Sequence, residues 1–126
     1  MQIGYEFLPV EKEEITHTQL VKYAGASGDF NPIHTVVPFA EEVGLNGAIA
    51  HGMLVMGFIG EATGTWFPDQ ELLELDVRFK AMTRPGETIT VSGRIVEEQP
   101  EYWGCEAYAK NEEEVKVSAA FRVKKT

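Results

Sequence analysis

The sequence is poor in cysteine, in basic residues and in long apolar runs, and each shortage excludes a class of protein. A single Cys105 cannot form a disulfide within the chain, which is typical of a reducing compartment, so we expect a cytoplasmic protein. Eleven Lys and Arg against 20 Asp and Glu give a formal net charge of −9, which argues against nucleic acid as a partner. No apolar run approaches the roughly 20 residues of a membrane-spanning helix, and the first residues lack the basic and apolar regions of a secretory signal. We therefore expect no membrane partner.

The remaining composition is that of a globular protein. Hydrophobic residues make up 44% of the 126 residues, which is enough for a core, and we expect a single domain over residues 1–126. The chain shows no repeat or linker, but its pattern changes along its length. Residues 16–67 are typical of helices and loops, and residues 71–125 are typical of strands.

The second half predicts an antiparallel sheet. Apolar and charged residues alternate with period two, which is the pattern of a strand with one buried face, and turn signals separate the runs. We expect Gly93 at a β-bulge and the stretch "YEFLPV" near the start as an extra edge strand. The short connections predict a meander of four consecutive strands, within residues 71–82, 87–98, 102–110 and 114–125.

Residues 51–66, "HGMLVMGFIGEATGTW", predict a helix that is buried against this sheet. Such a helix would be roughly 24 Å long. Gly57, Gly60 and Gly64 share one face, and each costs about 1 kcal/mol of helix propensity relative to alanine. We expect the glycines to permit close approach of backbone inside a curved sheet.

Two shorter helices are expected before the long one. The first covers "THTQLVKYAGAS", with Thr16 or Thr18 as its cap. The second covers "PFAEEVGL", where Pro38 suits a first turn and Gly44 a helix end.

The stretch "GASGDFNPIH" carries the first candidate site residues. Asn31-Pro32 disfavours helix, and Asp and Asn favour turns, so Asp29 and His34 flank a tight corner that directs both side chains into one space. A carboxylate and an imidazole that share one water form a general acid/base pair.

The stretch "AIAHGMLVMG" carries the second group of candidate site residues. If the long helix starts near His51, its first backbone N–H groups lack partners inside the helix and lie at the positive end of the helix dipole. Gly52 has no side chain to block a ligand, so its N–H is suited to a carbonyl oxygen that gains negative charge. Together the two segments indicate proton chemistry next to a carbonyl, with water added or removed at the β-carbon.

Each of these residues also has a plain structural interpretation. An isolated Asp29 is most often a turn or cap residue, His34 a hydrogen-bonded loop residue, and His51 a helix cap or core residue. A metal site of Asp29, His34 and His51 is conceivable, but the spacing matches no metal signature. Ser27 lacks the surroundings of a nucleophile elbow, and Cys105 is typical of core packing.

The two stretches, "YAGASGDFNPIH" and "GLNGAIAHGMLVMG", resemble the MaoC-like (R)-specific enoyl-CoA hydratase and (3R)-hydroxyacyl-thioester dehydratase family in its single-hotdog-domain form. The resemblance extends to "ELDVRFKAMTRPGETITVSGRI". It implies an α+β hotdog fold, a long central helix wrapped by a curved antiparallel sheet. It also implies a hydro-lyase that reversibly hydrates trans-2-enoyl thioesters of CoA or acyl carrier protein, in fatty-acid or polyester-precursor metabolism, without metal or cofactor.

Carried over residue by residue, the resemblance makes Asp29 and His34 the catalytic pair. It places Asn31 in the same motif loop, and it makes Gly52 the residue whose backbone N–H polarises the thioester carbonyl, with His51 beside it on the oxyanion and substrate side. It also implies dimers with a continuous sheet: a homodimer is expected, and a heterodimer with a second hotdog subunit is the alternative.

The chain departs from its relatives at two positions. Val36 stands where many relatives have an acidic residue, and Gly60 where some have a serine. An acyl-thioester hydrolase and a non-catalytic hotdog subunit are the competing functions, and the complete acid/base motif argues against both. Arg78, Lys80 and Arg84 form a local basic group for an anionic ligand, although the net charge disfavours an acidic carrier protein.

Overall fold

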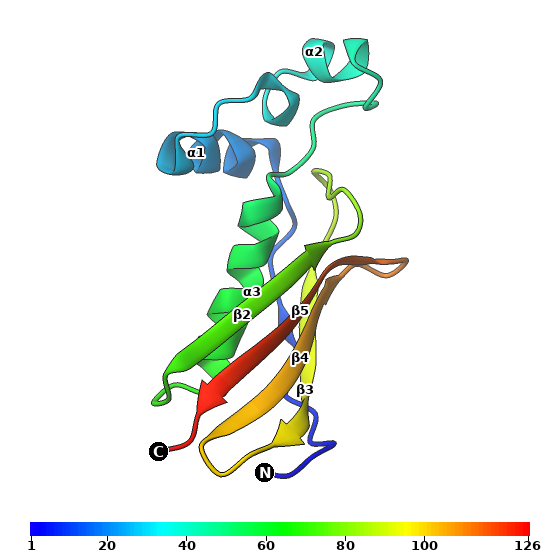
Figure 1. The fold of residues 1–126 in the computed structure, drawn as a ribbon. Coiled ribbons are helices and arrows are strands. Elements are labelled where there is room, and N and C mark those ends of the chain that lie inside the picture. The colour runs from blue at the N-terminus through cyan, green and yellow to red at the C-terminus, as the bar shows by residue number, and fades with distance from the viewer.

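The computed structural model describes residues 1–126, and in it a long helix lies along one face of a five-stranded antiparallel sheet (Figure 1). This helix, α3, covers Gly52–Trp66. The chain before it forms a small helical segment beyond one end of the sheet, and both termini lie at the opposite end. The helical segment contains α1 (His17–Ser27), the 3-10 helix η1 (Pro32–His34) and α2 (Val37–Glu42). The expected helix-on-sheet arrangement is confirmed.

The strand order is β1-β3-β4-β5-β2, which corrects the expected meander. Strands β3, β4 and β5 do follow one another, but β2 pairs with β5 at the opposite edge from β1. There its inward residues Leu75 and Val77 pack against the core, while residues 80–89 carry the chain across to β3. The strands are β1 (Val10–Glu11), β2 (Leu72–Phe79), β3 (Thr90–Glu98), β4 (Tyr102–Lys110) and β5 (Val115–Lys124).

The expected edge strand near the start is present but short. Only Val10 and Glu11 pair with β3, and Glu6 adds an isolated bridge to Arg94. No helix of the structure combines the length and apolar character that a membrane crossing requires.

The prediction of a bulge at Gly93 is wrong. Gly93 pairs in register with Ala107, and the register shifts further along, between Ile95 and Glu97. A glycine is required at this position because a Cβ would lie 2.6 Å from the backbone oxygen of Glu106 and 3.1 Å from the ring of Trp66.

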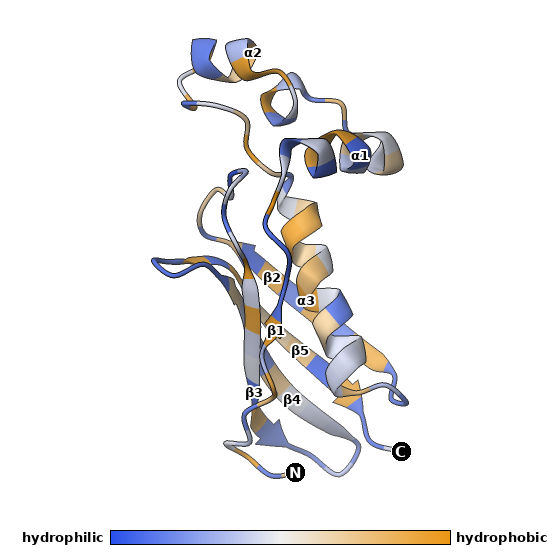
Figure 2. Ribbon diagram, turned by 180° about the vertical axis from the view of Figure 1, so that it is seen from behind, coloured by the Kyte–Doolittle hydropathy of each residue, from blue (hydrophilic) through white to orange (hydrophobic).

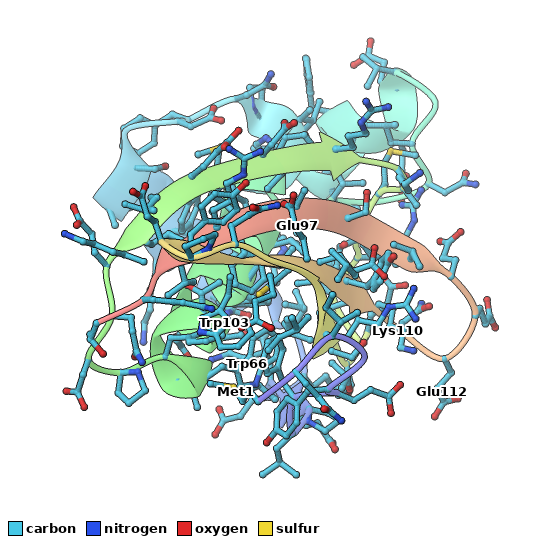
Figure 3. The ribbon with its side chains drawn as sticks, turned by 60° about the horizontal axis from the view of Figure 1, so that its bottom comes forward. Met1, Trp66, Glu97, Trp103, Lys110 and Glu112 are labelled. Carbon is cyan, nitrogen blue, oxygen red and sulfur yellow. The ribbon has the colours of Figure 1, made fainter.

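The core lies between α3 and the inner face of the sheet. Val55, Phe58 and Ile59 of α3 are buried there with the inward residues of the central strands. Figure 2 shows apolar colouring along much of α3. At the end of α3 near the termini, seen from below in Figure 3, Trp66 stacks on Phe7 with ring centroids 4.6 Å apart. Burial of such apolar and aromatic surface is the main stabilising contribution to the fold.

Gly57, Gly60 and Gly64 of α3 do not have the expected role within this chain. A Cβ at Gly57, Gly60 or Gly64 would meet no atom within 4 Å, so no strand or loop of the same chain approaches them closely. Their face of the helix differs from the face of Val55, Phe58 and Ile59, and these larger side chains make the contact with the sheet.

Candidate active site

The candidate site begins in the loop that follows α1. Gly28 caps α1 in the left-handed conformation (φ 76°), and its N–H donates to Ala24 O. Asp29 Oδ1 then accepts from the N–H of Asn31 at 3.2 Å, and Asn31 Oδ1 accepts from the N–H of Ile33 at 3.2 Å. These consecutive side-chain-to-backbone turns define the corner that Asn31-Pro32 predicted. They use only one oxygen of Asp29, so the second remains available.

That second oxygen faces His34. Asp29 Oδ2 lies 3.9 Å from His34 Nε2, with the histidine buried and the carboxylate half-exposed. His34 Nδ1 lies 2.8 Å from the backbone oxygen of Ile49. A carbonyl oxygen only accepts hydrogen bonds, so Nδ1 carries the hydrogen and the neutral ring keeps its lone pair on Nε2. The nitrogen of His34 that carries the lone pair is therefore directed toward Asp29.

His51 joins this pair to the start of α3. Its Nε2–H donates to the backbone oxygen of Asp29 at 3.1 Å, and its ring stacks on the ring of His34 with centroids 3.8 Å apart. Tyr23 contacts the ring of His51 edge-on. His51 is 2% exposed, and its Nδ1 has no hydrogen-bond partner in the chain. The two stacked rings therefore restrict each other's orientation, and the hydrogen bond from His51 fixes the backbone of the Asp29 loop.

Asp29, His34 and His51 also bring possible metal-ligand atoms within 4.8 Å of one another. A metal ion must lie close to the plane of each imidazole ring that binds it. The rings of His34 and His51 are stacked with only 23° between their planes, so their lone pairs do not converge on a shared point nearby. The observed arrangement fits an acid/base pair on a supporting ring better than a metal site.

Gly52 is the first residue of α3, and its N–H donates to no acceptor of the chain. It lies in the wall of a cavity of about 350 Å³ that His34 also lines. A Cβ at Gly52 would lie 3.0 Å from the ring of Phe79, so the absence of a side chain keeps this wall open. The other lining residues are mostly apolar: Ile49, Ala50, Val55, Phe79, Lys80, Ala81, Met82, Thr83 and Val117.

The structure thus brings together Asp29, His34, His51 and Gly52, which the sequence placed in two separate stretches. Asn31 is exposed and uses its side-chain oxygen inside the loop, while the Ser27 hydroxyl accepts from the N–H of Asp29. Cys105 is buried in β4, and this burial raises the pKa of its thiol to about 12.

Sequence reasoning missed the wall that residues 79–83 contribute to the cavity. The alternation predicted the strand β2, but no pattern indicated that the loop after it returns to α3. Of the expected basic group, Lys80 lines the cavity, whereas Arg84 donates to Leu45 O at 2.5 Å and holds a loop.

A long helix packed on one face of an antiparallel sheet is the arrangement of the hotdog fold. The sequence matches the MaoC like domain family over residues 1–117. The chain therefore belongs to the MaoC-like domain family.

Two curated relatives show moderate identity. The (R)-specific enoyl-CoA hydratase of Rhodospirillum rubrum is 34% identical over 89 residues, which is 69% of this chain and 62% of that protein. The 3-hydroxybutyryl-CoA dehydratase of Methylorubrum extorquens is 33% identical over 92 residues, which is 71% of this chain and 59% of that protein. The chain thus spans about three fifths of the length of both relatives.

Solved structures share the fold at lower identity. R-hydratase PhaJ1 from Pseudomonas aeruginosa superimposes with a TM-score of 0.89 at 24% identity, over 98% of this chain and 81% of that one. A chain of the ChsH1-ChsH2 complex from Mycobacterium tuberculosis gives a TM-score of 0.90 at 17% identity, over 99% and 98%. The hotdog fold implied by the motif resemblance is confirmed.

Proposed function

We propose that this protein is a hydro-lyase that reversibly hydrates trans-2-enoyl thioesters to (3R)-hydroxyacyl thioesters. The observation that carries the proposal is the placement of the Asp29–His34 pair, 3.9 Å apart, beside a cavity whose wall contains the free N–H of Gly52. The names of the two curated relatives support the same reaction class.

Hydration adds one water across the double bond between Cα and Cβ of the substrate. The water oxygen bonds to Cβ, one of its hydrogens stays on the new hydroxyl, and the other is balanced by the hydrogen gained at Cα. His34 accepts a proton from the water at Nε2, because its Nδ1–H is held by Ile49 O. Asp29 Oδ2 orients the same water and stabilises the protonated imidazole. The pair then returns a proton to Cα.

Gly52 provides the complementary electrostatic contribution. When the water oxygen attacks Cβ, negative charge moves to the thioester oxygen, where an enolate forms. An N–H at the first position of the 15-residue α3 lies at the positive end of its dipole and has no other partner. A preorganised donor of this kind stabilises the enolate more than the ground-state carbonyl.

The mostly apolar lining of the cavity suits an acyl chain better than a polar metabolite. We assign an acyl thioester as the substrate, carried either by CoA or by an acyl carrier protein. Asn31 supports the loop of the catalytic pair, and His51 supports both loop and pair. The proposed reaction uses water together with side-chain and backbone groups of the protein.

We further propose that the protein acts as a homodimer, with a heterodimer with a second hotdog subunit as the alternative. Large apolar side chains around the site are exposed in one chain, including Phe30, Val36, Phe39 and Met53. Exposed apolar side chains of this size commonly mark a protein interface. Mass measurement of the purified protein in solution distinguishes a dimer from a monomer.

The test of the function is hydration of crotonyl-CoA by the purified protein, followed as loss of enoyl-thioester absorbance, with the configuration of the product determined. We expect the (3R)-hydroxy thioester. Asp29→Asn and His34→Ala should each lower kcat by roughly 10²- to 10⁴-fold, the usual contribution of a general acid/base, with an unchanged circular dichroism spectrum.

Full activity in either variant would refute the assigned roles. Release of free thiol without hydration would instead identify a thioester hydrolase. If the protein alone turns over neither crotonyl-CoA nor longer enoyl thioesters, and activity appears only when a second hotdog subunit is added, the protein is a supporting subunit.

A further inference from the structure

The loop after β2 forms one wall of the site cavity and is attached to the start of α3. Lys80, Ala81, Met82 and Thr83 all line the cavity. The backbone oxygen of Thr83 accepts from the N–H of Ala50 at 2.7 Å. Ala50 precedes His51 and Gly52 directly, so a shift of this loop is transmitted to the N–H that the proposed reaction uses.

A buried lysine on the neighbouring strand holds the loop from behind. Lys116 of β5 is only 2% exposed, although it is charged. Its Nζ donates to Met82 O at 2.8 Å, and its own backbone oxygen accepts from the N–H groups of Lys80 and Ala81 at 2.8 and 3.2 Å. Position 116 therefore contacts three consecutive residues of the cavity wall, and the contact with Met82 is the one that depends on the lysine side chain.

Two carboxylates complete the coordination of this ammonium group. Glu114 Oε1 lies 2.7 Å and Glu87 Oε1 lies 2.9 Å from Lys116 Nζ. Glu87 also accepts from Asn111 Nδ2 at 2.6 Å and from the backbone N–H of Arg84. The start of the loop, at Lys80 and Ala81, and its end, at Glu87, therefore both bond to Lys116.

The charges of this cluster stabilise one another. Burial alone would lower the pKa of Lys116, but its hydrogen bonds to Glu114 and Glu87, together with their charges, raise it above its ordinary value. Burial would raise the pKa of Glu87, and the hydrogen bonds from Lys116 and the Arg84 N–H outweigh it and lower that pKa. Lys116 therefore remains charged and fully hydrogen-bonded under ordinary conditions.

Stability alone does not account for a lysine at this position. A buried ion pair is often no more stabilising than well-packed apolar residues, because desolvation of the charges offsets their attraction. Lys116 lies at a register shift of β5, between Val115, which pairs with Lys110, and Val117, which pairs with Ala109, so it stands outside the regular inward series of Val117 and Ala119. What an apolar side chain does not supply is a donor that reaches the Met82 carbonyl.

We propose that Lys116 is a positioning residue for the site, acting through Met82 and Thr83 on Ala50 and Gly52. The expected change in kcat rests on the proposed function, whereas the control of the loop by Lys116 rests on the contacts of Lys116 with Met82 and of Thr83 with Ala50. Lys116 touches no substrate atom in this scheme. It sets where the Gly52 N–H lies relative to the acid/base pair of Asp29 and His34.

The first variant is Lys116→Met, which keeps the length of the side chain and removes the donor. At a temperature where the variant is fully folded, we expect kcat with crotonyl-CoA to fall on the order of ten- to a hundredfold, with a smaller change in KM. This split follows because a displaced Gly52 N–H weakens the transition state more than substrate binding. A variant with wild-type kcat would overturn the proposal.

Amide hydrogen exchange tests the same chain of contacts without any turnover. In Lys116→Met, the amide of Ala50, which donates to Thr83 O, should lose protection, while the amides of the β3–β4 hairpin keep it. Unchanged protection at Ala50 would overturn the proposal. If the wild-type protein hydrates no enoyl thioester, the proposed function fails, whereas the exchange result still decides whether Lys116 controls the loop.

A second pair of variants keeps the test decisive if Lys116→Met does not fold. Glu114 and Glu112 are both exposed carboxylates of the turn between β4 and β5, where Glu112 projects outward (Figure 3), but only Glu114 bonds to Lys116. Glu114→Gln should lower kcat in the same direction as Lys116→Met, by a few-fold, and Glu112→Gln should leave it unchanged. Equal kcat values for the two variants would overturn the proposal.

Discussion

At the scale of single residues, Asp29 serves two purposes with its two oxygens. Oδ1 closes the turn with the Asn31 N–H, and Oδ2 faces His34 Nε2 at 3.9 Å. The structural and the chemical interpretation of this aspartate are therefore both valid. Asp29→Asn should preserve the turn, since its side-chain oxygen still accepts from Asn31, which makes it the sharper of the two catalytic-pair variants.

Gly52 supports a prediction of its own. A Cβ at this position would lie 3.0 Å from the Phe79 ring, at the point where the substrate carbonyl is proposed to approach. Because Phe79 is half-exposed and free to shift, Gly52→Ala should fold normally but lower kcat/KM for crotonyl-CoA by roughly tenfold or more, the effect of a small misplacement at a reacting centre.

The matched control lies on the same helix. Gly57→Ala adds the same methyl group where no atom of the chain lies within 4 Å. Its kcat/KM should equal that of the wild-type protein. If Gly52→Ala were equally active, Gly52 would not be the carbonyl-binding residue.

At the scale of elements, α3 is held by tertiary packing in spite of its composition. It contains four glycines, and its buried contacts come from Val55, Phe58, Ile59 and Ala62. Isolated helices of this length are marginal in water even with better propensities. The helix forms because the sheet covers its apolar face.

The uncovered glycine face leads to a stability prediction. In an open helical position, Gly64→Ala should raise the free energy of unfolding by roughly 0.5–1 kcal/mol, because alanine loses less backbone entropy on folding. Urea unfolding, monitored by circular dichroism, measures this difference. A loss of stability that grows with protein concentration would show instead that a second chain packs against this face in solution.

At the scale of the whole molecule, acidic residues dominate, with a net charge of −9. In the cluster around Lys116, however, each charged group has a partner of opposite charge, because Glu87 and Glu114 both bond to Lys116. The cluster links β5, the turn between β4 and β5, and the loop that lines the site cavity. Its charge state therefore affects global stability as well as the local wall.

The cluster predicts a pH dependence with a defined sign. The folded pKa of Glu87 lies below its ordinary value of 4.5, so its contribution is present above that pH and is lost as the pH falls through the lower folded value. The folded pKa of Lys116 lies above 10.5, so its contribution is present below that pH and is lost as the pH rises through the higher folded value.

We therefore expect Glu87→Gln to lower the free energy of unfolding by about 1.5–3 kcal/mol at pH 7, the usual range for hydrogen bonds to a charged group. The difference from the wild-type protein should shrink at pH 3. Urea unfolding at the two pH values, with Glu112→Gln as the control, measures it. A difference that is equal at both pH values would contradict the assigned charge state.

The sequence by itself determined the elements and the motif residues, because the signals for both are local. Alternation with period two identified the strands, "HGMLVMGFIGEATGTW" identified α3, and the Asn31-Pro32 corner predicted that Asp29 and His34 would meet. These features depend on backbone preferences and turn chemistry within a few residues.

Only the tertiary structure decided which elements meet. The position of β2 beside β5, the stacking of His51 on His34 and the contact of Lys116 with Met82 join residues that are distant in the sequence. The alternation in β2 predicts a strand but not its partner, because any edge with free N–H and C=O groups offers equivalent hydrogen bonds. Packing of the whole core selects one edge, and that choice places residues 80–83 in the wall of the site cavity.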